Sequence, residues 1–236
     1  MWQLQIVLMA LFVVVGSATV SGAQVVVGTA RVIDGDTLEI NERRVRLLGI
    51  DAPEAAQELT LVTGGTDFLG RGAALMLRSL VRESAVRCEL SSQRDDRGVD
   101  LAMCFSGTVD LGATMVARGM AMATVSYRSP YIAIEAEARN ARRGFWRDKT
   151  EAPWAFRRRR TTQAKASVPG GCAFKAKRDE AGARTLFTPW SPWYEAVQVN
   201  EANGDRWFCS EAEAVADGWF APHWLMRSIV SGVYNP

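Results

Sequence analysis

The sequence predicts an α+β protein in which a small, mainly β domain carries helices and a smaller cysteine-containing module follows. Short apolar runs separated by turn residues dominate the first half of the chain. Segments with helical spacing lie between and after these runs, without strict alternation of strand and helix. The 236 residues are 48% hydrophobic and 23% charged, an ordinary globular composition with room for one domain and a small second unit.

The N-terminal residues have the pattern of a secretory leader. Residues 1–23 contain no charged side chain, an apolar run extends from Ile6 to Val15, and the small residues 21–23 follow it. This pattern predicts a signal peptide cleaved before Gln24, although its start lacks the usual positive charge. An uncleaved N-terminal anchor is the alternative. Under either interpretation the protein is exported, to the periplasm or the medium, and no integral membrane domain is expected after leader removal.

Five strands build the predicted mainly β domain. They are expected over residues 25–33, 37–40, 44–50, 85–90 and 101–105. The Asp34-Gly35 pair and the stretch 41–43 separate the first three strands as turns, and a polar loop over 55–67 follows the third. A five-stranded OB-like barrel fits this order of strands.

Three helices are expected beside these strands. Their spacing places them over residues 68–81, 110–118 and 130–143. Asp110 is the expected N-cap of the second helix, and Gly119 lies just past its end. Ser129 is the expected cap of the third helix, with Pro130 in its first turn and Gly144 as its C-cap.

Four cysteines in an exported chain predict two disulfides. Cys88 and Cys104 lie in the two strands of one predicted hairpin, so we pair them and assign Cys172 to Cys209. A zinc site is the alternative, but the chain has no C-x-x-C motif and its only histidine is His223.

The C-terminal third predicts a basic linker and a small module. The expected divisions are a leader over 1–23, the barrel domain over 24–154, the linker over 155–171 and the module over 172–236. A basic stretch from Arg142 to Arg160 runs into the linker, which continues over 161–171 without periodicity. A stretch of this kind can alternatively hold a polyanion.

The module contains one clear helix signal and several aromatic residues. Ser210 and Glu213 predict a capping box, and Gly218 ends the helix that it starts. Because a small unit needs its aromatic residues inside, we expect the tryptophans to form a core rather than a stacking surface for sugars. These residues are Trp190, Trp193, Trp207 and Trp219.

Three charged residues stand at the end of the third strand, in the stretch RVRLLGIDAPE. Arg46, Asp51 and Glu54 are costly to bury there unless they are paired or bind a ligand. Arg46 is a bidentate donor suited to phosphate, and Glu54 could accept a proton from an attacking water. The ordinary alternatives are a structural salt bridge for Arg46 and a solvated loop charge for Glu54.

Asp36 adds a fourth charge to this group. If the second and third strands form an antiparallel hairpin centred between positions 43 and 44, Asp36 faces Asp51. Two adjacent carboxylates repel unless a cation lies between them, and oxygen ligands suit Ca²⁺. A turn-forming role for Asp36 is the simpler alternative. Together with Arg46 and Glu54, however, the pair predicts a site for phosphodiester hydrolysis.

The stretches RVIDGDTLEI and RVRLLGIDAPE, at this separation, resemble the staphylococcal nuclease (thermonuclease-like) family, and the resemblance extends over residues 25–146. It implies an OB-like barrel with three helices and Ca²⁺-dependent cleavage of DNA and RNA. Asp36 and Asp51 match the calcium carboxylates, and Ala52 matches the carbonyl ligand. Arg46 matches the first catalytic arginine, and Glu54 matches the general base.

The resemblance fails at the second catalytic arginine. In the stretch DDRGVDLA, Val99 takes that position, and the nearby Arg97 is the remaining candidate to contact the substrate. By analogy with arginine fingers, such a residue is worth roughly 10³–10⁵ in rate. Tyr127 matches one of the substrate-contacting tyrosines of the family. The metal side of the site is therefore expected to be complete and the substrate side to be eroded.

Two functions follow as expectations. The first is an exported, Ca²⁺-dependent nuclease that acts on DNA or RNA and is weakened by Val99. The alternative is a catalytically disabled barrel that acts in exopolysaccharide (succinoglycan) biosynthesis or binds another acidic polymer, as exported rhizobial relatives suggest.

Overall fold

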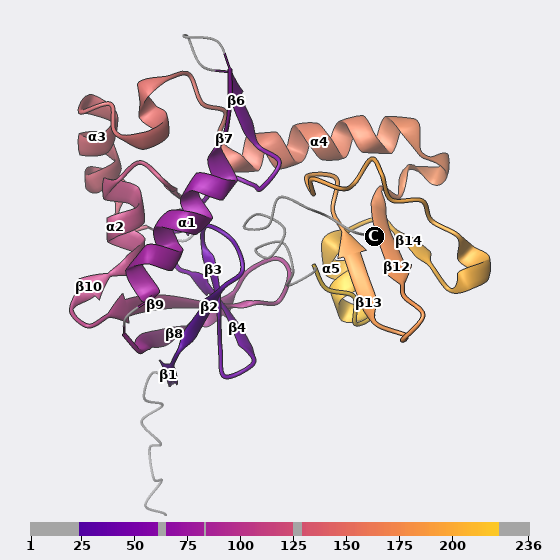
Figure 1. Ribbon diagram of the computed structural model, residues 1–236, viewed down its shortest axis with the longest axis horizontal. Coiled ribbons are helices and arrows are strands. Elements are labelled where there is room, and N and C mark those ends of the chain that lie inside the picture. The colour runs from indigo at the N-terminus through magenta and orange to yellow at the C-terminus, as the bar shows by residue number, and fades with distance from the viewer. Residues whose placement is uncertain (1–23, 61–64, 83, 125–128, 222–236) are drawn as a thin grey trace, which may run out of the picture.

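The computed structural model describes residues 24–60, 65–82, 84–124 and 129–221 of the 236-residue chain. The predicted leader, Tyr127 and His223 lie outside the described residues. A sheet with three helices forms the N-terminal part, and a smaller sheet forms the C-terminal part. A long helix extends from one part to the other along the upper edge of Figure 1.

The large sheet confirms the predicted α+β architecture. Its strands are β1 (Val25–Gly28), β2 (Ala30–Val32), β3 (Thr37–Ile40), β4 (Arg43–Leu47), β8 (Val86–Arg94), β9 (Asp100–Ser106) and β10 (Val109–Asp110). The order is β1-β8-β9-β4-β3-β2, and β10 pairs with β9. Strands β4 and β9 run parallel, and the other pairs are antiparallel. The first predicted strand is divided into β1 and β2.

Two short strand pairs lie beside the large sheet. Strand β5 (Ile50–Asp51) pairs with β11 (Met122–Ala123), and β6 (Glu58–Thr60) pairs with β7 (Thr66–Phe68). The β6–β7 hairpin lies where the sequence predicts only a loop. Its strands are three residues long, too short to show the alternation by which a strand is recognised.

Helices α1 (Leu69–Val81) and α2 (Leu111–Ala117) confirm two of the three predicted helices. The side chain of Asp110 accepts the N–H of Ala113 at 2.9 Å, as expected of an N-cap. Helix α3 (Ile132–Asn140) is shorter than predicted: Ser129 does not cap it, and Gly144 does not end it. The helix stops earlier because Arg142 has a positive φ of 50°.

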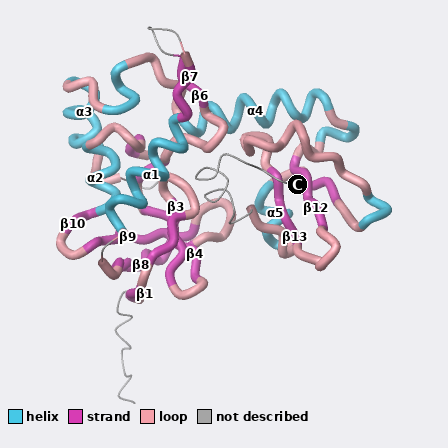
Figure 2. The backbone as a smooth tube through the Cα atoms, viewed as in Figure 1, coloured by secondary structure: helices cyan, strands magenta, loops and turns pink. Residues whose placement is uncertain are grey.

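The core of the N-terminal part lies between the sheet and these helices, which gather on one side of it in Figure 2. Leu38, Val45, Leu77 and Met115 are fully buried there. The predicted Cys88–Cys104 disulfide joins facing positions of β8 and β9, with Cα atoms 4.0 Å apart.

Helix α4 (Pro153–Ser167) replaces most of the predicted linker. Pro153 occupies its first turn, which suits a helix start. Only Pro153, Phe156 and Ala164 are buried along its 15 residues. Basic and polar side chains occupy the rest of its surface, so the apolar periodicity that identifies a helix is weak. No described helix has the length and apolar character needed to cross a membrane.

The C-terminal unit, residues 172–221, contains a sheet of order β13-β12-β14 and a short helix. Its elements are β12 (Phe174–Arg178), β13 (Arg184–Phe187), β14 (Arg206–Phe208) and α5 (Glu211–Ala216). The predicted Cys172–Cys209 disulfide is present. Ser210 caps α5 as predicted, but the side chain of Glu213 reaches back to the N–H of Cys209 rather than that of Ser210.

The tryptophans of this unit divide between core and partly exposed positions. Trp219 is 1% exposed and packs with Phe174 and Phe208, as expected of a core residue. Trp190, Trp193 and Trp207 are half-buried. The core expectation is therefore met fully by one of the four.

Candidate active site

Two buried carboxylates meet at one end of the large sheet. Asp36 lies just before β3, and Asp51 ends β5. Asp36 Oδ2 and Asp51 Oδ1 lie 3.1 Å and 2.7 Å from the same nitrogen, Nη2 of Arg46. The two acidic side chains therefore converge on one positive charge.

The way in which they meet differs from the prediction. The β3–β4 hairpin places Thr37 opposite Arg46, so its register does not pair Asp36 with Asp51. Asp51 lies beyond the hairpin, in β5, because the chain turns at Gly49, whose φ is +80°. That turn brings Asp51 back toward the start of β3.

Local hydrogen bonds hold Asp36 in place. Its Oδ2 accepts the N–H of Ala52 at 3.0 Å, and the hydroxyl of Thr37 donates to Oδ1 at 2.9 Å. Burial alone would raise the pKa of Asp36, but Arg46 and the Ala52 N–H outweigh it and lower that pKa to about 2. Asp36 is therefore ionised at neutral pH. The sequence analysis predicts the carbonyl oxygen of Ala52 as a cation ligand. The hydrogen bond that the structure gives for Ala52 in this site is the one from its N–H to Asp36.

Glu54 lies in the loop after β5, and α1 packs directly against that loop. A Cβ atom at Gly70 of α1 would lie 2.2 Å from the carbonyl oxygen of Glu54, so only glycine permits this approach. Burial raises the pKa of Glu54, and Arg157 opposes that shift. A carboxylate of raised pKa is a better proton acceptor than an exposed one.

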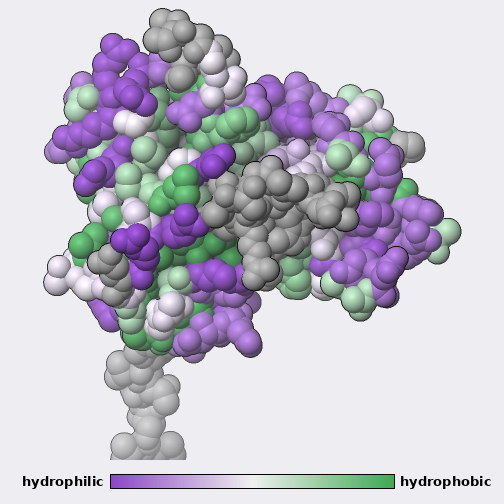
Figure 3. Space-filling model, viewed as in Figure 1, coloured by the Kyte–Doolittle hydropathy of each residue, from purple (hydrophilic) through white to green (hydrophobic). Residues whose placement is uncertain are grey.

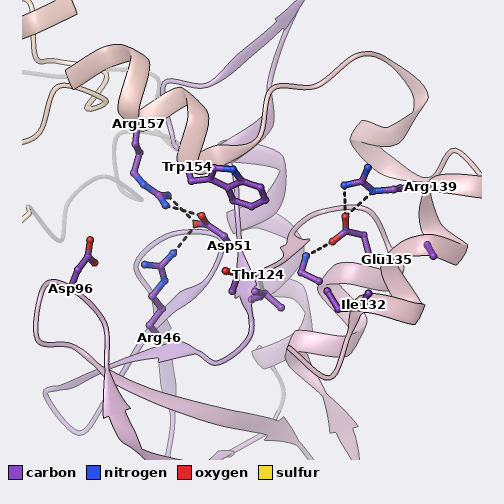
Figure 4. Close-up of a pocket in the computed structure, with 12 residues that line it drawn as sticks. Arg46, Asp51, Asp96, Thr124, Ile132, Glu135, Arg139, Trp154 and Arg157 are labelled. Atoms are coloured by element: carbon purple, nitrogen blue, oxygen red, sulfur yellow. Dashed lines mark hydrogen bonds and ion pairs between the residues drawn. The ribbon is translucent and has the colours of Figure 1, made fainter. Parts of the chain in front are cut away.

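Arg157 of α4 is the main site residue that the sequence analysis does not single out. Its Nη1 donates to Asp51 Oδ1 at 2.9 Å and to Glu54 Oε1 at 2.7 Å, and its Nη2 donates to Asp51 Oδ2 at 2.7 Å. In Figure 4 Arg157 reaches Asp51 from above and Arg46 reaches it from below. The available signal was the basic stretch of residues 142–160, which does not indicate which of its arginines turns inward.

The loop that carries Arg97 and Val99 is organised around Asp95. Asp95 Oδ1 accepts the N–H groups of Arg97 and Val99 at 3.0 Å and 2.8 Å. The Arg97 guanidinium pairs with Asp95 at 2.9 Å and with Glu211 of α5 at 3.7 Å. Asp95 also lies 3.5 Å from Arg46. Arg97 is thus near Arg46 but is directed toward the C-terminal unit, and Val99 brings no charge to the site.

A cavity of about 630 Å³ opens beside these charges. Arg46, Asp51 and Arg157 line one side of it, and Trp154, which is 42% exposed, lies next to them. The cavity is large enough for a small organic ligand. Tyr127, the other predicted substrate contact, lies outside the described residues.

The donor set fits a hard cation. Asp36 and Asp51 supply carboxylate oxygens, the ligand type that Ca²⁺ prefers, and they already share a guanidinium nitrogen as a stand-in positive charge. Among the residues that the structure describes, no three His, Cys, Asp or Glu side chains form a metal-holding group by themselves. A cation at this position would also compete with Arg157 for Asp51.

Comparison with known proteins agrees with this geometry. Residues 44–148 match the sequence model of the family described as Staphylococcal nuclease homologue. A protein named "Uncharacterized endonuclease" from Escherichia coli O157:H7 is 32% identical over 138 residues, which cover 55% of this chain and 83% of the relative. The chain belongs to the staphylococcal nuclease homologue family. The matched range contains Arg46, Asp51 and Glu54, and the OB-like fold of the family agrees with the observed sheet and helices.

Two further relatives of this staphylococcal nuclease homologue carry different names. "Succinoglycan biosynthesis protein ExoI" from Rhizobium meliloti (strain 1021) is 32% identical over 139 residues, covering 57% of this chain and 72% of that protein. "Micrococcal nuclease" from Shigella flexneri is 32% identical over 146 residues, covering 54% and 78%. The family match ends at residue 148, so α4 and the C-terminal unit lie outside it.

Proposed function

We propose that the protein is an exported, Ca²⁺-dependent nuclease that hydrolyses phosphodiester bonds in DNA or RNA, with a rate reduced by Val99. The observation that carries this proposal is the convergence of Asp36 and Asp51 on one nitrogen of Arg46, beside Glu54 and an open cavity. The relatives named endonuclease and micrococcal nuclease support the same reaction class. The two disulfides are compatible with export.

Each residue of the candidate site has a separate role in this proposal. Asp36 and Asp51, with the backbone carbonyl of Ala52, would hold the ion, which when bound supplies a Lewis acid that polarises a phosphoryl oxygen. Arg46 binds the phosphate through its guanidinium, although its present pairing with carboxylates must loosen for this contact. Glu54 accepts the proton of the attacking water.

The test uses purified protein with plasmid and single-stranded DNA, in the presence of Ca²⁺ or of a chelator. We expect Ca²⁺-dependent cleavage that is lost in Glu54→Gln while calorimetry still detects Ca²⁺ uptake, since Glu54 is assigned to proton transfer. We expect Val99→Arg to cut faster than the wild type. Absence of cleavage by both the wild type and Val99→Arg would rule out the nuclease.

A second candidate function is a catalytically disabled barrel that binds an acidic polymer such as an exopolysaccharide. It is favoured by the pairing of Asp51 and Glu54 with Arg157, which leaves the proposed ion ligand and base engaged with the protein's own cation. The relative named for succinoglycan biosynthesis points the same way. Absence of cleavage by the wild type, together with cleavage by Val99→Arg, would support this function.

A further inference from the structure

A second cleft, of about 460 Å³, is lined by some of the same arginines. One wall of this cleft is α4, and residues of the C-terminal unit line it as well. Arg46, Asp96 and Arg157 line both this cleft and the cavity at Asp51. The cleft and the cavity are therefore neighbours.

The α4 wall presents one face of the helix to the cleft. Arg158, Thr161 and Lys165 lie at positions i, i+3 and i+7, the spacing that places side chains on one face of a helix. Arg158 and Lys165 are exposed, and neither side chain has a hydrogen bond or ion pair with another residue that the structure describes. Arg159, on a different face, is paired with Glu151.

Positive charge predominates in the cleft. Among the described residues that line it, five are basic and two are acidic. The basic ones are Arg46, Arg97, Arg157, Arg158 and Lys165, and the acidic ones are Asp96 and Glu211. Because Arg46, Arg97 and Arg157 already have carboxylate partners, Arg158 and Lys165 supply the charge that remains for a ligand.

The C-terminal unit adds an aromatic surface. The half-buried Trp190 lines the cleft and contacts Phe174 edge-to-face, with ring centroids 5.7 Å apart and planes at 86°. That contact holds the indole in one orientation. Figure 3 shows hydrophilic residues over much of α4 and the outer side of the C-terminal unit. A basic groove that also offers an aromatic face is the combination by which proteins hold single-stranded nucleic acid.

We propose that this cleft is a binding site for a single nucleic-acid strand, in which Arg158 and Lys165 contact phosphates and Trp190 stacks on a base. The proposal rests on the proposed nuclease function, since the strand in the cleft is the continuation of the one cleaved at Asp51 and Glu54. It gives α4 and the C-terminal unit, which lie outside the family match, a role in holding substrate.

The test measures binding without cleavage. Full-length protein is titrated into a fluorescein-labelled oligothymidylate of about 12 nucleotides, in chelator, and anisotropy is recorded at several salt concentrations. We expect the Arg158→Ser/Lys165→Ser double variant to bind roughly tenfold more weakly. The slope of log binding constant against log salt concentration should become shallower by about 1.4. This is the value expected when two phosphate contacts with a single strand are lost. Trp190→Leu should bind at least about fivefold more weakly.

The matched control is Lys149→Ser/Arg159→Ser, which removes the same charge from residues that do not line the cleft. It should bind the oligonucleotide within about twofold of the wild type, and circular dichroism checks that each variant is folded. Equal weakening in both double variants would overturn the proposal. So would failure of the wild type to bind, or tighter binding of alginate than of the oligonucleotide, which would indicate an acidic polysaccharide.

The two proposals fail separately. If the wild type cleaves DNA but the cleft variant binds as well as the control, the cleft proposal is wrong and the nuclease proposal stands. If the wild type binds the strand through Arg158 and Lys165 but neither it nor Val99→Arg cleaves DNA, the nuclease proposal is wrong. The strand-binding site then stands.

Discussion

The side chain of Arg157 places a positive charge in the candidate site, next to Asp51 and Glu54. Its guanidinium makes three charge-assisted hydrogen bonds, two to Asp51 and one to Glu54. Such bonds to charged groups contribute about 1.5–3 kcal/mol each when partly buried. A divalent ion bound to Asp51 would be repelled by this guanidinium and would share its acceptor oxygens, so ion uptake competes with Arg157.

We therefore expect Arg157→Gln to bind Ca²⁺ more tightly, by about tenfold, because the competing guanidinium is gone. Isothermal calorimetry on the full-length protein measures this affinity directly and does not depend on catalysis. The control is Arg159→Gln, which removes an equal charge two residues further along the helix, where Arg159 forms an exposed pair with Glu151. Equal Ca²⁺ affinities in the two variants would contradict the competition.

Among the elements, α1 packs against the loop that carries Glu54, the proposed base. Gly70 and Gly72 both lie in α1, but their surroundings differ. A Cβ at Gly70 would lie 2.2 Å from the carbonyl oxygen of Glu54, whereas at Gly72 nothing lies within 4 Å. The close approach at Gly70 allows the helix to pack against residues 54 and 55.

The two substitutions to alanine should have opposite effects on the free energy of unfolding. Gly72→Ala should stabilise the protein by about 0.5–1 kcal/mol, because alanine favours the helix. Gly70→Ala should destabilise it by about 1–3 kcal/mol, because the added methyl group displaces the Glu54 loop. Urea unfolding followed by circular dichroism measures both. A stabilised Gly70→Ala variant would show that the loop moves without cost.

In the whole molecule, charged contacts join the C-terminal unit to the N-terminal part. Arg97 pairs with Glu211 of α5, and Arg44 donates to the carbonyl of Ala221 at 3.1 Å. Within the unit, Asp205 is 2% exposed and joins separate segments. It accepts hydrogen bonds from the N–H groups of Asn200 and Arg178 and from the Lys177 ammonium, each at 2.9 Å.

The bonds to Asp205 make stability depend on pH. Burial would raise the pKa of Asp205, but the hydrogen bonds from Asn200 and Arg178 outweigh it and lower the pKa below its ordinary value of 3.8. A carboxylate with a lowered folded-state pKa contributes stability above pH 4 that is lost as pH falls through the folded value. The C-terminal unit should therefore loosen in acid below about pH 4.

Asp205→Asn should lower the free energy of unfolding by about 2–3 kcal/mol at pH 7, since a charged acceptor is lost. The difference from the wild type should shrink in acid, as the pH falls through the lowered pKa of Asp205 and the wild-type carboxylate also takes up a proton. Thermal unfolding over a pH series from 7 down into acid tests this, with the exposed Glu180→Gln as control. A difference that stays constant over the whole series would contradict the assignment.

Local signals predicted most of the fold and part of the site. Short apolar strands, the Asp110 cap and the Cys88–Cys104 pair depend on neighbouring residues or on one hairpin, so the sequence contains them. The early end of α3 was missed because it depends on a positive φ at Arg142. An arginine adopts that conformation here, so the glycine that usually marks a helix end is absent from the position. The β6–β7 hairpin was missed because its strands are too short to show a period.

The sequence by itself determined the family and the four charges at the centre of the site, because RVIDGDTLEI and RVRLLGIDAPE specify a turn, two strands and their polar ends. Only the tertiary structure decided that Arg157, one of four consecutive arginines, points at Asp51 and Glu54 while Arg158 faces a cleft. Consecutive helix residues point in directions about 100° apart, so the docking of α4 selects which arginine reaches the site. That docking depends on contacts between residues more than a hundred positions apart.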